Sequence, residues 1–442
     1  MRIESISREV KSLLWLLALL WEAISASPFD SVQTYKLKNG INVVLDPFPH
    51  SSLTAIAVCV RSGSSDEPMN ARGVAHLVEH MIFRQAKKIS KLESLGAITN
   101  AETAFDYTAF YCVVQSNIVY DAVKAMCELF TPTLDRSSID VEKEIISLEL
   151  MQRDEDPIKL VRVISQGLLL GFHSISDNSD LKQLSYEQVL HFYRTNYVPS
   201  KMSVICSGSF DENALLKTLQ ETFGRLKGNG DELPELKQRQ SRGFLDFLKP
   251  LVLEIDKPFH AMSMSFLAPG ASEPKALVAT EVIAMHLSDS HIGILAKLAN
   301  QHQGNRLPIL RFEVSFIPRR HESILSLNFL LSEGRFAEVE KEIIEQLNNM
   351  RNNLLSEERL LQCKRLSELH FRTRCKTVLE RAKTLAEAEG IANYELAIRY
   401  PELIEGVSSN DIMHLSKRIF NARAYAVTII KPSTTHRITD GG

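Results

Sequence analysis

An internal repeat limits the possible folds of this chain more than any other feature of its sequence. The segment that begins at Ser185 aligns without gaps with the segment that begins at Ser408, over twenty residues. The matched pairs are Val189 with Ile412, His191 with His414, Arg194 with Lys417, Tyr197 with Phe420 and Val204 with Val427. Each copy has the pattern of a helix followed by a strand. The repeat therefore predicts two homologous halves of about 200 residues each.

The other expected elements favour the α+β class. Alternating apolar residues around Asn39-Gly40 predict a hairpin across 32–45, since both turn residues tolerate positive φ. Apolar periodicity predicts further strands at 53–60 and 107–115 and helices at 71–83, 117–130 and 138–153. We expect two homologous domains, each a mainly antiparallel sheet packed with helices. The expected bounds are 28–228 and 244–442, with a polar linker at 229–243.

Composition narrows the class of protein and its partners. The 442 residues are 44% apolar and 24% charged, as in soluble globular proteins and unlike disordered or multispanning ones. The net charge is -3, and no stretch is dense in Lys and Arg interleaved with aromatic residues. These features argue against a nucleic-acid partner.

The first 27 residues have the pattern of a secretory signal peptide. Arg2, Arg8 and Lys11 precede an apolar run from Leu13 to Trp21, and small residues follow. The run is too short to cross a hydrocarbon core, which needs about 20 residues. We therefore expect residues 1–27 to be removed and the protein to be exported, to a periplasm.

Six cysteines are spread along the chain without a Cys-x-x-Cys motif or a dense framework. Such cysteines are expected to behave as small buried hydrophobic residues. They are Cys59, Cys112, Cys127, Cys206, Cys363 and Cys375.

The motif His76-Leu-Val-Glu79-His80 carries the chemistry. On a helix, His76 and His80 project from one face, so both imidazoles can hold one ion, with Glu79 beside them. Zinc takes three protein ligands and leaves a position for water, whose proton an adjacent carboxylate can remove. We expect one zinc ion per chain and Glu79 as the general base.

The third metal ligand should come from the helix expected at 138–153. Glu142 and Glu149 lie two turns apart on that helix and share a face. Periodicity does not choose between them.

Three segments carry a resemblance to a known family. They are Gly73 to Phe83, then Asn100 to Thr103 with Tyr107 to Tyr111, then Glu142 to Glu149. Together they resemble the pitrilysin and insulysin family of zinc metallopeptidases, the inverzincins. The short, two-domain branch that includes mitochondrial processing peptidase and bacterial periplasmic homologues is the most similar.

This resemblance implies a role for each site residue. By likeness to the family, Glu149 is the third zinc ligand, and Glu142 supports the site behind the ligands. The resemblance also implies that Asn100, Ala101, Glu102 and Thr103 form an edge strand that binds a peptide substrate as an added β-strand.

The second half departs from the family pattern. Active members carry an Arg and a Tyr seven positions apart, which bind the substrate carbonyl. The region from Asp289 to Phe316 contains no Tyr, and Pro308 interrupts it. When Glu273-Pro274 is aligned with Glu67-Pro68, Val282, Met285 and His286 occupy the positions of His76, Glu79 and His80. The second half therefore has no metal motif, and His286 is expected to be a core or surface residue.

Three hypotheses follow. The first is the metal-bearing subunit of a heterodimer, whose homologous partner supplies the Arg and Tyr. The second is a non-catalytic binding or assembly subunit of the same fold. The third is a homodimer that works without the pair, or with Arg306 or Arg311 in its place. The intact metal motif favours catalysis.

Overall fold

The computed structural model describes residues 27–84, 87–130, 134–170, 178–227, 250–291, 293–300, 307–421 and 425–433. The expected signal peptide, apart from Ser27, and the expected linker at 229–243 lie outside these residues. Among the described helices, none combines the length and the apolar character needed to cross a membrane.

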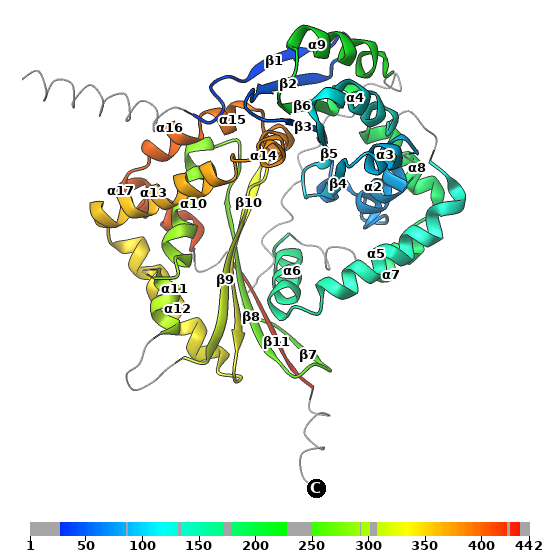
Figure 1. Cartoon of the computed structure of the whole chain (residues 1–442). Coiled ribbons are helices and arrows are strands. Elements are labelled where there is room, and N and C mark those ends of the chain that lie inside the picture. Colours follow the sequence, from blue (N-terminus) through cyan, green and yellow to red (C-terminus); the bar gives the residue numbers. More distant parts are fainter. Residues whose placement is uncertain are drawn as a thin grey trace, which may run out of the picture.

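Two mainly antiparallel sheets, both packed with helices, form the framework (Figure 1). The strands of the first sheet run in the order β1-β2-β6-β3-β5-β4, and those of the second in the order β7-β11-β8-β10-β9. This architecture confirms the expected α+β class. The first sheet contains β1 (Gln33–Lys36), β2 (Asn42–Pro47), β3 (Leu53–Val60), β4 (Ile98–Thr103), β5 (Thr108–Gln115) and β6 (Met202–Gly208). The second contains β7 (Leu251–Ile255), β8 (His260–Pro269), β9 (Ile309–Ile317), β10 (Glu322–Leu331) and β11 (Tyr425–Pro432).

The sequence repeat occupies equivalent positions in the two sheets. β6 lies between β2, to which it is parallel, and β3, to which it is antiparallel. β11 lies in the same way between β7 and β8. The helices before these strands, α8 (Tyr186–Asn196) and α17 (Ser409–Ile419), both begin with a capping box, from Ser185 and Ser408. The two copies of the sequence repeat thus fold into a helix and a strand that have the same neighbours in their respective sheets.

The helices lie on both faces of the sheets (Figure 1). In the first half they are α2 (Val74–Arg84), α3 (Lys87–Ser94), α4 (Val119–Glu128), α5 (Ile139–Arg153), α6 (Pro157–Leu169), α7 (Asn178–Gln183), α8 and α9 (Glu212–Glu221). In the second half they are α10 (Pro274–Ser288), α11 (Ile294–Ala299), α12 (Phe336–Asn352), α13 (Glu357–Thr373), α14 (Val378–Ile391), α15 (Glu395–Ile398), α16 (Tyr400–Glu405) and α17.

The two halves exchange one helix each. α14 of the second half packs on β3, β5 and β6 of the first sheet, and α6 of the first half packs on β8, β10 and β11 of the second (Figure 1). A buried ion pair joins α14 to β2, with Arg381 Nε 2.7 Å from Asp46 Oδ2. Burial on both faces explains why β3 is apolar apart from Thr54 and shows no polar alternation.

All six cysteines are free and buried. Their burial confirms the expectation that they act as small hydrophobic residues.

Candidate metal centre

A buried carboxylate fixes the start of the motif helix. Glu67 accepts hydrogen bonds at 3.0 Å from the backbone N–H groups of both Gly73 and Ala75. It thereby satisfies donors that the first turn of a helix leaves unpaired, and its negative charge favours that end of the helix dipole. As a result α2 begins at Val74, three residues later than the expected start at 71.

Three side chains from two helices converge on one point. His76 and His80 lie one turn apart on α2, and Glu149 faces them from α5. The Nε2 atoms of both histidines are 3.6 Å from Glu149 Oε2. One potential ligand atom from each residue lies within 4.8 Å of the other two. Two imidazoles and one carboxylate at this spacing form a donor set that suits a zinc ion with an open fourth position.

Burial keeps one histidine in the form that binds metal. The pKa of His76 is lowered to about 4 because burial disfavours the imidazolium, and unfavourable charge interactions with His80 and Arg153 add to this effect. His76 is therefore neutral at neutral pH, with a nitrogen lone pair available.

Glu142 holds the other histidine from behind. Its Oε2 lies 3.2 Å from His80 Nδ1, and Arg84 Nη1 donates to its Oε1 at 2.6 Å. The Glu142 side chain is only 4% exposed, whereas that of Glu149 is 50% exposed. With Nδ1 hydrogen-bonded to a carboxylate, the Nε2 of His80 is left for the ion, which is the usual arrangement of metal-binding histidines.

Glu79 is almost buried beside these ligands. It is 7% exposed, and Thr103 Oγ1 donates a hydrogen bond of 2.6 Å to its Oε2. Burial raises the pKa of Glu79 to about 7, against the opposing effects of this hydrogen bond and of His80. A cation bound between the histidines would lower that pKa, because it favours the carboxylate.

The four residues expected to bind substrate lie on β4, at the edge of the first sheet. β4 pairs only with β5 among the described strands. Thr103 contacts Glu79, as described above, and Ala101 packs against the core. Glu102 accepts hydrogen bonds from the hydroxyls of Tyr107 at 3.3 Å and Tyr111 at 2.7 Å. Asn100 Oδ1 accepts a hydrogen bond of 2.9 Å from the Ala101 N–H.

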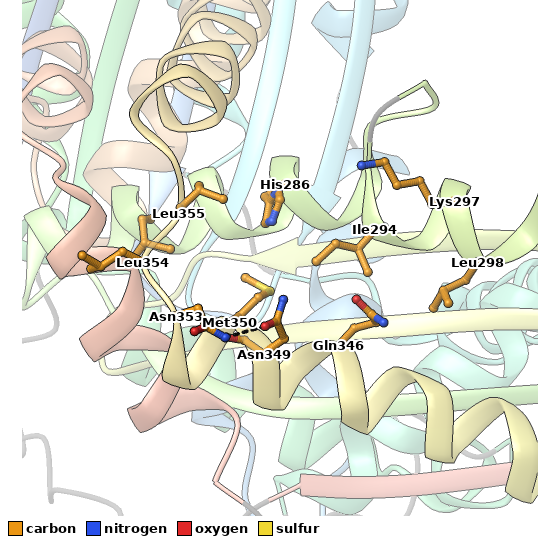
Figure 2. A pocket seen from close by; sticks show the side chains of 11 residues that line it. His286, Ile294, Lys297, Leu298, Gln346, Asn349, Met350, Asn353, Leu354 and Leu355 are labelled. Atoms are coloured by element: carbon orange, nitrogen blue, oxygen red, sulfur yellow. Dashed lines mark hydrogen bonds between the residues drawn. The ribbon is translucent and has the colours of Figure 1, made fainter.

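In the second half, α10 is the counterpart of α2, and its histidine has a different partner. His286 on α10 accepts a hydrogen bond of 3.0 Å from Arg359 Nε, so its partner is a cation and not a carboxylate. It lines a cavity of about 380 Å³ with Lys297 and with apolar and amide side chains of α11 and α12 (Figure 2). Arg311, considered above as a substitute for the missing pair, is bound to Asp156 at 2.6 Å. Arg306 lies outside the described residues.

Two residues of the site were missed by sequence reasoning. Glu67 precedes the helix it caps by seven residues, and Arg84 is at the end of α2, where a basic residue is common for other reasons. Only the folded chain reveals that Glu67 turns back to α2 and that Arg84 reaches Glu142.

Comparison with known proteins identifies relatives of both halves. A family model described as Insulinase (Peptidase family M16) matches residues 42–166, and one described as Peptidase M16 inactive domain matches residues 183–367. The probable mitochondrial-processing peptidase subunit beta of Schizosaccharomyces pombe is 26% identical over 221 residues, 47% of this chain and 48% of that protein. An uncharacterized zinc protease of Streptomyces coelicolor is 24% identical over 205 residues, 44% of this chain and 45% of that protein. The chain thus spans about half the length of the curated relatives it matches.

A solved structure matches nearly the whole fold. The crystal structure of a protease from Helicobacter pylori superposes with a TM-score of 0.82 at 18% identity, over 91% of this chain and 99% of that one. At this identity the likeness concerns the fold, and the chemistry has to be argued from the site.

Proposed function

Because the chain belongs to the insulinase family of peptidases, family M16, we propose that it is a zinc-dependent endopeptidase that hydrolyses peptides or unfolded segments. The convergence of His76, His80 and Glu149 carries this proposal. A bound zinc ion would supply a position for water and lower the pKa of that water to about 7. His76, His80 and Glu149 are the proposed ligands of one ion, and Glu142 orients His80.

Glu79 is the proposed general base. Its carboxylate lies on the ligand helix but outside the converging group of His76, His80 and Glu149, so it is available to the attacking water. It takes a proton from that water and later gives it to the leaving amine nitrogen. Burial raises the pKa of Glu79, and a cation bound beside it would lower that pKa again and favour the carboxylate, which is the form that accepts a proton.

The proposed substrate is an extended peptide bound along β4. An edge strand offers unpaired backbone N–H and C=O groups, and an added strand can use them whatever its side chains are. Asn100, Ala101, Glu102 and Thr103 lie on this strand. Specificity is then expected to depend on the extended backbone more than on sequence.

A partner chain is part of the proposal. The second half lacks an Arg and Tyr pair in the region where the family carries it, so a homologous subunit would supply that pair. Four apolar side chains on α5, the helix of Glu149, are exposed and would be covered by a partner. They are Val141, Ile145, Leu148 and Met151. A homodimer remains the second form of the same proposal.

Export is proposed on the basis of the sequence of residues 1–27 alone. Detection of the mature chain in the periplasmic fraction would support it, and retention of an uncleaved chain in the cytoplasm would contradict it.

The test is cleavage of an unfolded, quenched-fluorescence peptide by the zinc-loaded chain, alone and with a homologous subunit. Glu79→Gln should keep zinc and lose hydrolysis by at least about 100-fold. Glu221→Gln, which changes an exposed carboxylate at the end of α9, is the matched control and should keep full activity. Activity only with the partner would support a shared site. A zinc-loaded chain inert in both arms would favour the assembly-subunit hypothesis.

A further inference from the structure

We propose that the metal-free second half of the chain positions Glu79 for proton transfer, acting through the β4–β5 hairpin and the hydroxyl of Thr103. This inference rests on the proposed peptidase function and assigns a role to the half that has no metal motif. Thr103 is a positioning residue here, since it contacts Glu79 and not the reacting atoms.

The contact between Thr103 and Glu79 is specific. Among the described residues, Thr103 is the only side chain that donates a hydrogen bond to the Glu79 carboxylate, and it binds Oε2. Oε1 is left for the proton of the attacking water. A glutamate has three rotatable side-chain bonds, so one hydrogen bond from a fixed strand removes much of its freedom.

The strand is fixed only if the hairpin turn after Thr103 is fixed. That turn contains Asp106, which is 6% exposed. The backbone N–H of Arg320, in the turn between β9 and β10, donates to Asp106 Oδ2 at 2.8 Å. Arg320 Nη2 donates to Asp106 O at 3.1 Å and to Gly390 O at 3.3 Å. Arg320 thus ties the hairpin of the first half to two elements of the second.

The neighbouring arginine extends this contact to the loop before α2. Arg319 Nη2 donates to Ser65 Oγ at 2.8 Å, and its guanidinium lies 4.9 Å from the centre of the Phe105 ring. The N–H of Ser65 in turn donates to Phe105 O at 2.7 Å. The hairpin turn and the segment that precedes the motif helix are therefore held by the same side chain.

Helix α14 of the second half holds the strand itself. Lys383 Nζ lies 3.6 Å from Glu102 Oε2, directly before Thr103. Tyr107 packs so closely on Gly390 that a Cβ at that glycine would lie 2.5 Å from the Tyr107 Cγ. One face of the hairpin end is thus in contact with α14 of the second half.

The first test changes the hydroxyl alone. Thr103→Val keeps the shape of the side chain and removes the donor, whereas Thr103→Ser keeps the donor. We expect kcat to fall about tenfold in the valine variant and less than about threefold in the serine variant. KM and zinc content should stay within about twofold in both, because neither the substrate backbone nor the ligands change.

The second test changes the link between the halves. Arg320→Ala should lower kcat about fivefold, with zinc content unchanged. It should also speed amide hydrogen exchange in peptides covering residues 98–108. Arg399→Ala is the matched control, since Arg399 forms an exposed pair with Glu402 at 3.3 Å.

Each outcome decides the inference. Lower kcat in Thr103→Val and Arg320→Ala, rescue by serine and faster exchange in the hairpin would support it. An active wild type with unchanged kcat in Thr103→Val, or unchanged exchange in Arg320→Ala, would overturn it and leave the proposed function intact. An inert zinc-loaded wild type would remove the proposed function and this inference together.

Discussion

The helices α2 and α10 occupy equivalent places in the two halves, yet their histidines have opposite surroundings. His80 on α2 lies between two carboxylates, Glu142 and Glu149. His286 on α10 contacts the guanidinium of Arg359 at 3.0 Å. A histidine between acids can hold a cation, whereas one beside an arginine repels it. The same fold thus brings together a set of possible metal ligands in one half, whereas in the other half the equivalent histidine has a cation as its partner.

The pKa values show the same contrast. Burial and the nearby charges of Arg359 and Lys297 lower the pKa of His286 to about 4. His286 is therefore a neutral group in the wall of a cavity (Figure 2), and the described residues that line this cavity include no acid to complete a ligand set. Similar pKa values in His76 and His286 consequently do not imply similar roles, and the carboxylate of Glu149 makes the difference.

The largest expected difference in zinc binding is between a variant that lacks a proposed ligand of the first half and one that lacks the equivalent histidine of the second half. His80→Ala should reduce bound zinc from one ion per chain to almost none and abolish hydrolysis, because two ligands hold zinc poorly. His286→Ala should keep the full zinc content. Elemental analysis after dialysis measures both. Equal zinc loss in the two variants would contradict the assignment of the metal to the first half.

The next largest effect is on the free energy of unfolding, when the buried ion pair between the two halves is broken. Arg381→Met leaves Asp46 buried without its partner, so the free energy of unfolding should fall by about 3 kcal/mol or more. Urea unfolding measures this, with Arg399→Met as an exposed control. A change below about 1 kcal/mol would show that the ion pair contributes little to joining the halves.

A smaller effect on zinc affinity is expected from Glu142, which supports His80. Glu142→Gln keeps the size of the side chain but weakens its hold on His80, and zinc affinity should fall about 10- to 100-fold. Competition with a chromophoric chelator measures the affinity, and the exposed Glu144→Gln serves as control. Equal affinities for all three proteins would remove Glu142 from its supporting role.

The smallest effect concerns a buried acid of the second half. Burial raises the pKa of Glu281 to about 7, so the folded chain keeps a proton that the unfolded chain releases near pH 4.3. This contribution to stability is present at low pH and is lost as the pH rises through about 7.

Glu281→Gln removes that titration. The Tm of the variant relative to wild type should therefore be higher at pH 8.5 than at pH 5.5, by roughly 2–4 °C for each kcal/mol. Thermal unfolding at the two pH values measures it. The same Tm difference at both pH values would show that Glu281 is not protonated in the fold.

Local features of the sequence were predictable because they depend on local forces. The apolar run at 53–60 predicted β3 at its observed bounds, and Asn39-Gly40 predicted the hairpin, where Gly40 has a φ of 96°. The spacing of His76 and His80 placed both on one helix face, as observed. These positions follow from helix and strand periods alone.

Contacts between distant segments were not predictable in the same way. Periodicity left Glu142 and Glu149 equivalent, and the choice between them came from a resemblance. The local sequence of α6 and α14 does not show that each helix packs on the sheet of the other half, because the same apolar face could equally cover the sheet of its own half. The contact of Arg320 with Asp106 depends on that arrangement and was missed for the same reason.

Anomalous diffraction at the zinc edge, from crystals of the zinc-loaded chain, tests the proposed metal centre directly. We predict one strong peak per chain, bounded by the Nε2 atoms of His76 and His80 and a carboxylate oxygen of Glu149. A peak at His286, or a zinc ion held without Glu149, would contradict it.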